Sequence, residues 1–560
     1  MASADATERT PVEIELLRNA LVSIADEMAI TEVRAAYSTV VRDLLDFSTA
    51  VCDAHGRVLA QGLTLAIQLG AIPRFMGFIA ERVPEPRAGD VYLVNDPWQG
   101  GVHLPDFFFA KPVILDGDSE PIAWAGIVTH MVDVGGRFPG GISVTASTLW
   151  EEGLVLPIVP LVQAGGLNQP VLDIIAANVR EPTKVLGDIR AALAGLDTCE
   201  RQVRELAGRL GRASLRGQMD AFLQYSERAT RSALAALPDG EATAEGFLDD
   251  DGVGGPPVRL RCTVTKHGDR LRFDYSGTDP QVAGGINCTI GDVASVSTFV
   301  AGATVGEDAV VNDGFSRCVE YSIPDGTVAS ARRPAAVSAR GTLLYRLADV
   351  ATAAMVQLAP DRLPAEGGGP GLITFSGTRA DGAPWICLDF QQAGWGATSA
   401  HDGVAGASHA ISNTGNIPIE AIEAEFPVLV SRYELLTDTG GTGRFGGAPA
   451  VCREYEVTAD GVHLGYRIER QTFPPQGLNG GDAGAPARCL VKRAGGDWEP
   501  VAPKGSTVLN GGDRFRMELP GGAGFGAGAD RPRSAVQRDL ADGLISQQRA
   551  AERYPSGTVE

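Results

Sequence analysis

The segment from Asp90 to Gly136 contains residue types that bind metal ions. The chain has only seven histidines among 560 residues, and two of them, His103 and His130, each stand three residues before an aspartate. Imidazole nitrogen and carboxylate oxygen together suit a divalent metal such as Zn²⁺, Mn²⁺ or Fe²⁺. Glycine pairs nearby let the backbone turn sharply and approach closely, as a polar pocket between strands requires. The pattern is therefore typical of a metal site.

The spacing by itself leaves a second interpretation open. Pro105 lies between His103 and Asp106 and interrupts any helix there. It also favours an extended conformation at Leu104, so the two side chains would have to converge through a turn. A histidine or aspartate in a loop is commonly a turn or cap residue, and the spacing alone does not establish ligands.

Strands are expected on both sides of these residues. Apolar runs predict strands at about 91–95, 107–113 and 122–129. Four polar residues then lie at strand ends or in the connecting loops: Asp96, His103, Asp106 and His130. Functional sites are commonly built at such positions.

Beyond this segment, the pattern of the chain changes near residue 240. Helical spacing of apolar residues predicts a first helix at 12–28 and a block of long amphipathic helices at 171–237. An acidic, glycine-rich linker or hairpin follows at 241–257. The chain then becomes rich in strands and turns, with one helix at about 342–357.

These elements predict an α+β fold with two domains, since a chain of this length exceeds the roughly 250–300 residues of one core. The first domain, residues 1–240, is expected to be mixed, with the candidate site and the long helices. The second domain, residues 241–560, is expected to be rich in β-strands and glycine.

Composition indicates a soluble, cytoplasmic protein. The formal charge of −21 repels polyanions and argues against nucleic acid as a partner. Apolar runs fall short of the about 18 residues that a membrane span needs, and the first residues lack the apolar segment of a secretory signal. Eight cysteines without a C-x-x-C pair indicate reduced thiols. We therefore expect no membrane, no nucleic acid and no disulfide framework.

Three further motifs could do chemistry but have simpler interpretations. Asp438-Thr-Gly-Gly-Thr442 is similar to the phosphate loop of actin-like ATPases, but another glycine turn follows it in place of a clear second strand. Cys288 follows a glycine pair, yet a cysteine beside apolar residues is more often a small buried hydrophobe. His401 and His409 lie in a polar stretch and are interpreted as loop histidines.

The segment around the two histidines resembles the hydantoinase B/oxoprolinase family. The family pattern GDV-x-x-x-NDP-x-x-GG-x-HLPD matches Gly89 to Asp106 nearly unbroken, and H-x-x-D-x-GG matches His130 to Gly136. Shorter matches extend the likeness over most of the chain, among them Leu45-Asp-Phe-Ser48, Glu151-Glu-Gly-Leu154, Gly284-Gly-Ile-Asn-Cys288 and Gly440-Gly-Thr-Gly-Arg-Phe445. The family includes subunits of ATP-dependent hydantoinases and lactamases, 5-oxoprolinases and ketone carboxylases.

The resemblance implies roles at the matching positions. It implies His103, Asp106 and His130 as protein ligands of one divalent metal, with Zn or Mn expected first and Fe as a further candidate. Three protein ligands leave an open position, as expected of a catalytic site. Asp133 would orient a ligand imidazole or take a proton, and Asp96 could do the same or serve as a turn residue.

Gln68 departs from the family pattern. Many relatives have a histidine before Leu-Gly where this chain has Gln68-Leu-Gly70. Glutamine cannot titrate, so an acid–base or ligand role at this position is lost. Its amide can still pair with a lactam or imide through one donor and one acceptor. We therefore expect Gln68 to bind the substrate in the catalytic site.

The resemblance also implies a reaction and a partner. ATP would bind to a separate hydantoinase A-like subunit, which phosphorylates the amide or carbonyl oxygen of a small-molecule substrate within a hetero-oligomer. This chain would then hydrolyse the activated cyclic amide. The alternative is an ATP-dependent ketone carboxylase of the acetone or acetophenone type. A third hypothesis, a non-catalytic scaffold, is opposed by the intact His103, Asp106 and His130.

Overall fold

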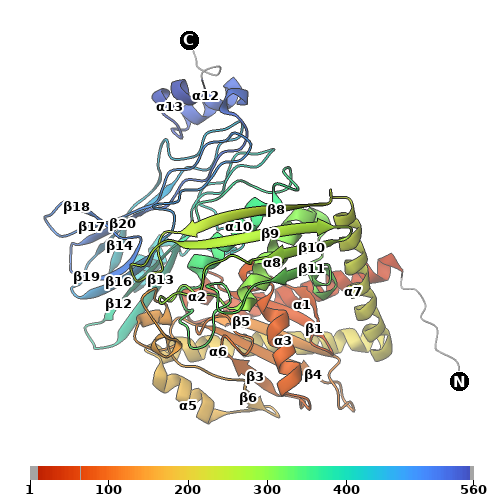
Figure 1. Ribbon diagram of the computed structural model, residues 1–560. Coiled ribbons are helices and arrows are strands. Elements are labelled where there is room, and N and C mark those ends of the chain that lie inside the picture. The colour runs from red at the N-terminus through yellow and green to blue at the C-terminus, as the bar shows by residue number, and fades with distance from the viewer. Residues whose placement is uncertain (1–9, 63–64, 555–560) are drawn as a thin grey trace.

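The computed structural model of the protein describes residues 10–62 and 65–554 (Figure 1). The described chain contains four β-sheets together with several long helices. The α+β class expected from the sequence is therefore confirmed.

A seven-stranded antiparallel sheet dominates the N-terminal half and carries the candidate metal ligands. Its strands follow the order β2-β1-β5-β4-β3-β6-β7. They are β1 (Phe47–Asp53), β2 (Val58–Gln61), β3 (Val91–Val94), β4 (Asp106–Val113), β5 (Ala123–His130), β6 (Val159–Gln163) and β7 (Gly166–Leu167). The three strands predicted around the histidines correspond to β3, β4 and β5 and are confirmed.

Both faces of this sheet are covered by helices. Phe108 of β4 packs against Phe75 of α3 (Ala71–Arg82) on one face. Phe107 and Phe109 belong to the apolar cluster on the other face, where α1 (Pro11–Ala35) and α6 (Pro182–Leu210) lie. Successive side chains of a strand point to opposite faces, so a strand covered on both sides is apolar throughout.

The long helices lie where the sequence predicts them. The first helix, α1, starts behind a capping box formed by Thr10 and Glu13 and continues to Ala35, beyond the expected 12–28. The helical block predicted at 171–237 consists of α5 (Gln169–Asn178), α6 and α7 (Arg212–Ala235). Short helices also occur: α2 (Thr39–Arg42), α4 (Leu149–Glu152) and α9 (Asp313–Ser316).

The C-terminal half contains three further sheets. The first has the order β11-β10-β9-β8 and contains β8 (Gly240–Leu248), β9 (Val258–His267), β10 (Arg270–Asp274) and β11 (Val319–Ser322). The second, β13-β12-β16-β19, contains β12 (Gly371–Thr378), β13 (Pro384–Gln391), β16 (Val462–Arg467) and β19 (Lys504–Leu509). The third, β14-β15-β20-β17-β18, contains β14 (Val428–Leu435), β15 (Val451–Val457), β17 (Arg488–Lys492), β18 (Trp498–Val501) and β20 (Arg514–Glu518). Because β8 and β9 pair antiparallel, the segment 241–257 is part of a hairpin.

The expectation of one helix in this half was wrong. The predicted helix is present as α10 (Gly341–Met355), but α8 (Ile290–Val305) packs beside it. Nearly every residue of α8 is buried, so the helix has no polar face and its sequence shows no amphipathic period. Four shorter helices were also missed: α9, α11 (Ile419–Glu425), α12 (Arg533–Ala541) and α13 (Gln547–Arg553).

One apolar cluster extends from Ile14 to Leu519 and includes residues on both sides of residue 240. The division into domains 1–240 and 241–560 stays a prediction. In Figure 1, α12 and α13 lie at the far end of the strand-rich half. None of the helices in the described ranges is long and apolar enough to cross a membrane.

Candidate metal centre

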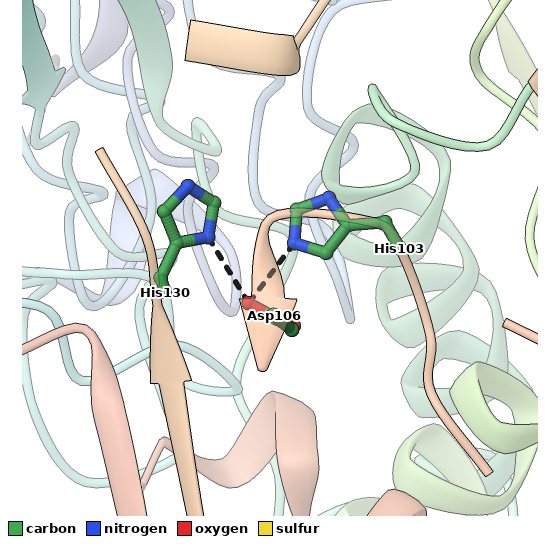
Figure 2. A group of neighbouring side chains, drawn as sticks. All are labelled: His103, Asp106 and His130. Carbon is green, nitrogen blue, oxygen red and sulfur yellow. Dashed lines mark hydrogen bonds and ion pairs between the residues drawn. The ribbon is translucent and has the colours of Figure 1, made fainter. Parts of the chain in front are cut away.

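His103, Asp106 and His130 converge at the end of the seven-stranded sheet (Figure 2). Asp106 is the first residue of β4 and pairs in register with His130, the last residue of β5. His103 lies in the loop before β4, and a turn closes where the Asp106 amide donates to the His103 carbonyl at 3.1 Å. The side chain of Asn95 holds this loop by donating to the Leu104 carbonyl at 2.8 Å. The residues therefore meet through a turn, as Pro105 requires.

One carboxylate oxygen lies between the two imidazoles. Asp106 Oδ1 is 3.1 Å from Nε2 of His103 and 3.0 Å from Nδ1 of His130. All three side chains are buried, and one ligand atom from each lies within 4.8 Å of the others. The arrangement is compact enough for a single ion to contact all three residues.

The protonation state of His103 favours a cation. Its Nδ1 donates to the Ser338 carbonyl at 2.9 Å, because a carbonyl oxygen can only accept. Burial lowers the pKa of His103 to about 4, although Asp106 opposes this shift. The ring is therefore neutral near pH 7, and its unprotonated Nε2 faces the carboxylate of Asp106. Two lone pairs at this distance repel each other unless a cation lies between them.

His130 adds a second unsatisfied atom. Its Nδ1 donates to Asp106, whereas its buried Nε2 has no hydrogen-bond partner among the described residues. Buried polar atoms without partners are rare in folded proteins and usually indicate a ligand or water. The donor set of two imidazoles and one carboxylate suits Zn²⁺, Mn²⁺ or Fe²⁺. The three residues therefore fit a divalent metal.

Arg340 orients the carboxylate from the opposite side. Its Nη2 donates to Asp106 Oδ2 at 2.8 Å, and its Nη1 donates to Asp292 at 2.6 Å. Burial would raise the pKa of Asp106, but the hydrogen bond from His130 and the charge of Arg340 hold it well below its ordinary value. Asp106 is thus fully ionised, with Oδ2 bound to the guanidinium and Oδ1 directed at the two histidines.

Asp46 lies on the other side of His130. Its Oδ2 is 3.8 Å from His130 Nδ1, and its backbone carbonyl accepts the His130 amide at 3.0 Å. Burial raises the pKa of Asp46 to about 6, and the nearby His130 opposes that shift. Asp46 belongs to the matched segment Leu45-Asp-Phe-Ser48, to which the sequence assigned no role.

The predicted residues Asp133 and Asp96 have partners outside the three-residue cluster. Asp133 accepts from the Arg180 backbone at 2.6 Å, from the Arg180 guanidinium at 3.0 Å and from the Gly140 amide at 3.0 Å. Asp96 accepts from Arg333 at 2.8 Å and caps the following turn through the Trp98 amide at 3.0 Å. Both carboxylates hold loops around the site, and their catalytic roles stay predictions.

Gln68 is buried at the end of a short 3₁₀ helix, η1 (Ala66–Gln68). Neither atom of its amide has a hydrogen-bond partner among the described residues. Its neighbour Ile67 lines the cavity beside the metal cluster, together with Leu65. Gln68 itself is not among the described residues that line this cavity. It therefore lies next to the cavity wall, and its amide makes no hydrogen bond to the cluster of His103, Asp106 and His130.

The other candidate motifs are structural in this fold. Cys288 is buried, and burial raises the pKa of its thiol well above the ordinary value, which opposes a nucleophilic role. In the glycine turn, the Gly441 amide donates to a backbone carbonyl, and the Thr442 hydroxyl bonds to Asp482. His409 bonds to the buried Asp349 at 3.3 Å, whereas His401 is exposed.

The chain is similar to known proteins over nearly its whole length. The family model for Hydantoinase B/oxoprolinase matches residues 10–528. A protein from Pseudomonas sp. described as a putative D-/L-hydantoinase component is 28% identical over 565 residues, covering 97% of this chain and 94% of that protein. The crystal structure of an ATP-dependent caprolactamase from Pseudomonas jessenii has a TM-score of 0.89 at 27% identity, covering 99% of this chain and 97% of that chain. An acetone carboxylase structure shares the fold, with a TM-score of 0.90 at 19% identity. The match covers 98% of this chain and 80% of that chain. The chain belongs to the Hydantoinase B/oxoprolinase family.

Proposed function

We propose that this chain is the metal-binding catalytic subunit of an ATP-dependent cyclic-amide hydrolase. The relatives with more than 25% identity reported above are a putative hydantoinase component and a caprolactamase, and both names denote enzymes that act on cyclic amides. The acetone carboxylase is more distant in sequence and supports only the fold. These relationships favour ring opening over carboxylation of a ketone.

The observation that carries the proposal is that Nε2 of His103 lies 3.1 Å from Asp106 Oδ1, beside the buried Nε2 of His130, which has no partner among the described residues. His103, Asp106 and His130 would hold the divalent ion. Such an ion supplies Lewis acidity, which activates water and polarises a substrate oxygen. The Ser338 carbonyl keeps the proton of His103 on Nδ1, and Arg340 keeps Asp106 ionised and fixes its rotation.

A separate subunit would supply the ATP chemistry. The hydantoinase relative from Pseudomonas sp. is named as one subunit of its enzyme, so we expect this chain to assemble with a hydantoinase A-like subunit that binds ATP. An unstrained amide resists hydrolysis, and phosphorylation of its oxygen turns the carbonyl carbon into a better electrophile. The residues of this chain would then bind the activated substrate and direct water to it.

Metal analysis tests the ligand assignment. The purified chain is expected to contain about one divalent ion per copy. His103→Ala and His130→Ala should each remove the ion and leave the circular dichroism spectrum unchanged. His267→Ala, which changes a histidine with a 90% exposed side chain, is the matched control and should retain the ion. Full metal content in both site variants would refute the assignment.

Activity tests the reaction. Co-expression with the ATP-binding subunit should yield a complex that opens hydantoins or lactams only when ATP is present. Product analysis by mass spectrometry identifies the ring-opened acid. If the complex instead incorporates labelled bicarbonate into a ketone and opens no cyclic amide, the carboxylase alternative is correct.

A further inference from the structure

Arg467 lies at the wall of the cavity that contains the metal cluster. It ends β16, where it pairs with Leu372 of β12 on one side and Lys504 of β19 on the other. The cavity is lined by Arg467 together with His103, Asp106 and His130. The side chain is half-buried. A cationic group is therefore present in the same cavity as the proposed catalytic ion.

The other arginines of this cavity are all paired with carboxylates. Arg340 bonds to Asp106 and Asp292, and Arg346 bonds to Glu366 at 2.8 Å. Arg470 bonds to Glu366 at 2.8 Å and to Asp349. Arg467 has neither an ion pair nor a hydrogen bond from its guanidinium to any residue within 10–62 and 65–554.

Arg467 is partly removed from water and has no counter-ion among the described residues. Burial lowers the pKa of its guanidinium to about 9, and the like charge of Arg340 adds to this effect, while Tyr345 opposes it. A partly desolvated charge gains from a counter-ion, and a guanidinium matches the two oxygens of a carboxylate or phosphate. The missing partner is thus expected to be an oxyanion that enters the cavity.

The adjoining cavity supports an anionic ligand. Arg467, Ile142 and Leu372 line both this second cavity and the cavity of the metal cluster. Arg137 and Arg180 also line the second cavity, but they form ion pairs with Glu151 and Asp133. Among the described residues that line this cavity, Arg467 therefore presents a positive charge that no carboxylate neutralises, and such a charge attracts anions.

We propose that Arg467 binds an oxyanion carried by the substrate, a role that rests on the proposed function of the site. Two groups have this chemistry: a carboxylate of the cyclic amide itself, and the phosphoryl group that the ATP-binding subunit adds. In either case Arg467 holds the anionic end at the junction of the two cavities while the amide carbon lies towards the metal cluster. Arg467 is then a determinant of substrate specificity.

Binding of simple anions to the metal-loaded full chain tests the site. Inorganic phosphate and acetate serve as probes in calorimetric titrations, with Arg467→Met, Arg467→Lys and the control Arg272→Met, which changes an exposed arginine of β10 outside both cavities. We expect at least one probe to bind, Arg467→Met to weaken it roughly 10- to 100-fold, and Arg467→Lys to restore part of the affinity. Arg272→Met and the metal content should not change.

The result that overturns the proposal is equal binding of both probes by wild type and Arg467→Met, or binding of neither by wild type. Thermal unfolding gives a second check. Arg467 makes no ion pair with the described residues, so Arg467→Met should not lower the unfolding midpoint. A large decrease would assign the guanidinium to the fold and would overturn the proposal.

Kinetics of the complex with its ATP-binding subunit identify the source of the anion. If Arg467→Met lowers kcat/KM for lactams with and without a carboxylate, the phosphoryl group is the ligand. If only the carboxylate-bearing lactam is affected, the substrate carboxylate is the ligand, and unchanged values for both overturn the proposal. A wild-type complex that opens no ring, with phosphate binding that still depends on Arg467, would refute the proposed function and leave the anion site intact.

Discussion

Glu152 is expected to make the stability of the protein decrease as pH rises. Its Oε1 accepts the Ser338 amide at 2.7 Å, and its Oε2 is buried without a partner among the described residues. Burial raises the pKa of Glu152 to about 8 from the ordinary 4.5, and hydrogen bonds from Ser338 oppose the shift. The folded state therefore keeps a proton that the unfolded state releases.

The direction and size of the pH effect on the free energy of unfolding follow from the difference between the two pKa values. Between pH 4.5 and 8 the folded state binds more protons than the unfolded state, so the free energy of unfolding falls as pH rises. For one group with these two pKa values, the loss between pH 5 and pH 8 is about 3 kcal/mol. Glu152→Gln keeps an acceptor for Ser338 but cannot ionise, so it should remove this loss.

The assay is denaturant unfolding of wild type and variant at pH 5 and pH 8. We expect Glu152→Gln to match wild type closely at pH 5 and to be more stable by about 3 kcal/mol at pH 8. Glu151→Gln is the matched control, because Glu151 is the adjacent residue and its pKa is lowered, first by a hydrogen bond from Ser147. If Glu152→Gln changes stability equally at both pH values, or if Glu151→Gln removes the same loss, the reasoning is refuted.

Three further predictions concern the site and its surroundings. Arg340→Met leaves Asp106 and Asp292 buried without their shared cation, so we expect a loss of about 3–5 kcal/mol in unfolding free energy; wild-type stability in chemical denaturation would contradict this. The isolated chain should not bind ATP, because the amide of Gly441 in the glycine turn already donates to a backbone carbonyl, and tight binding in a calorimetric titration would overturn the prediction. Gln68→Ala should raise KM for the cyclic amide, because the Gln68 amide has no partner among the described residues. The metal content and the unfolding midpoint should not change. An unchanged KM would remove Gln68 from the substrate site.

The strands and ligands of the metal cluster could be predicted from local sequence. Apolar runs bounded by turn residues indicated β3, β4 and β5 because the sheet is covered on both faces. The prediction failed for α8, where burial of most of its residues removes the amphipathic period that normally identifies a helix. Local sequence patterns therefore predicted an element only where its apolar residues were periodic or formed a run that turn residues bounded.

Residue types alone show which side chains could bind a metal, because donor chemistry is a property of residue type and Pro105 allows only a turn between His103 and Asp106. The residues that surround these ligands depend on the tertiary structure. Ser338 and Arg340 reach His103 and Asp106 across 235 and 234 residues, a separation over which no local pattern acts. In the folded protein, Asp133 pairs with Arg180, whereas Arg467 has no protein counter-ion among the described residues. The pairing of charges depends on which distant elements the fold brings together, so the sequence did not predict either result.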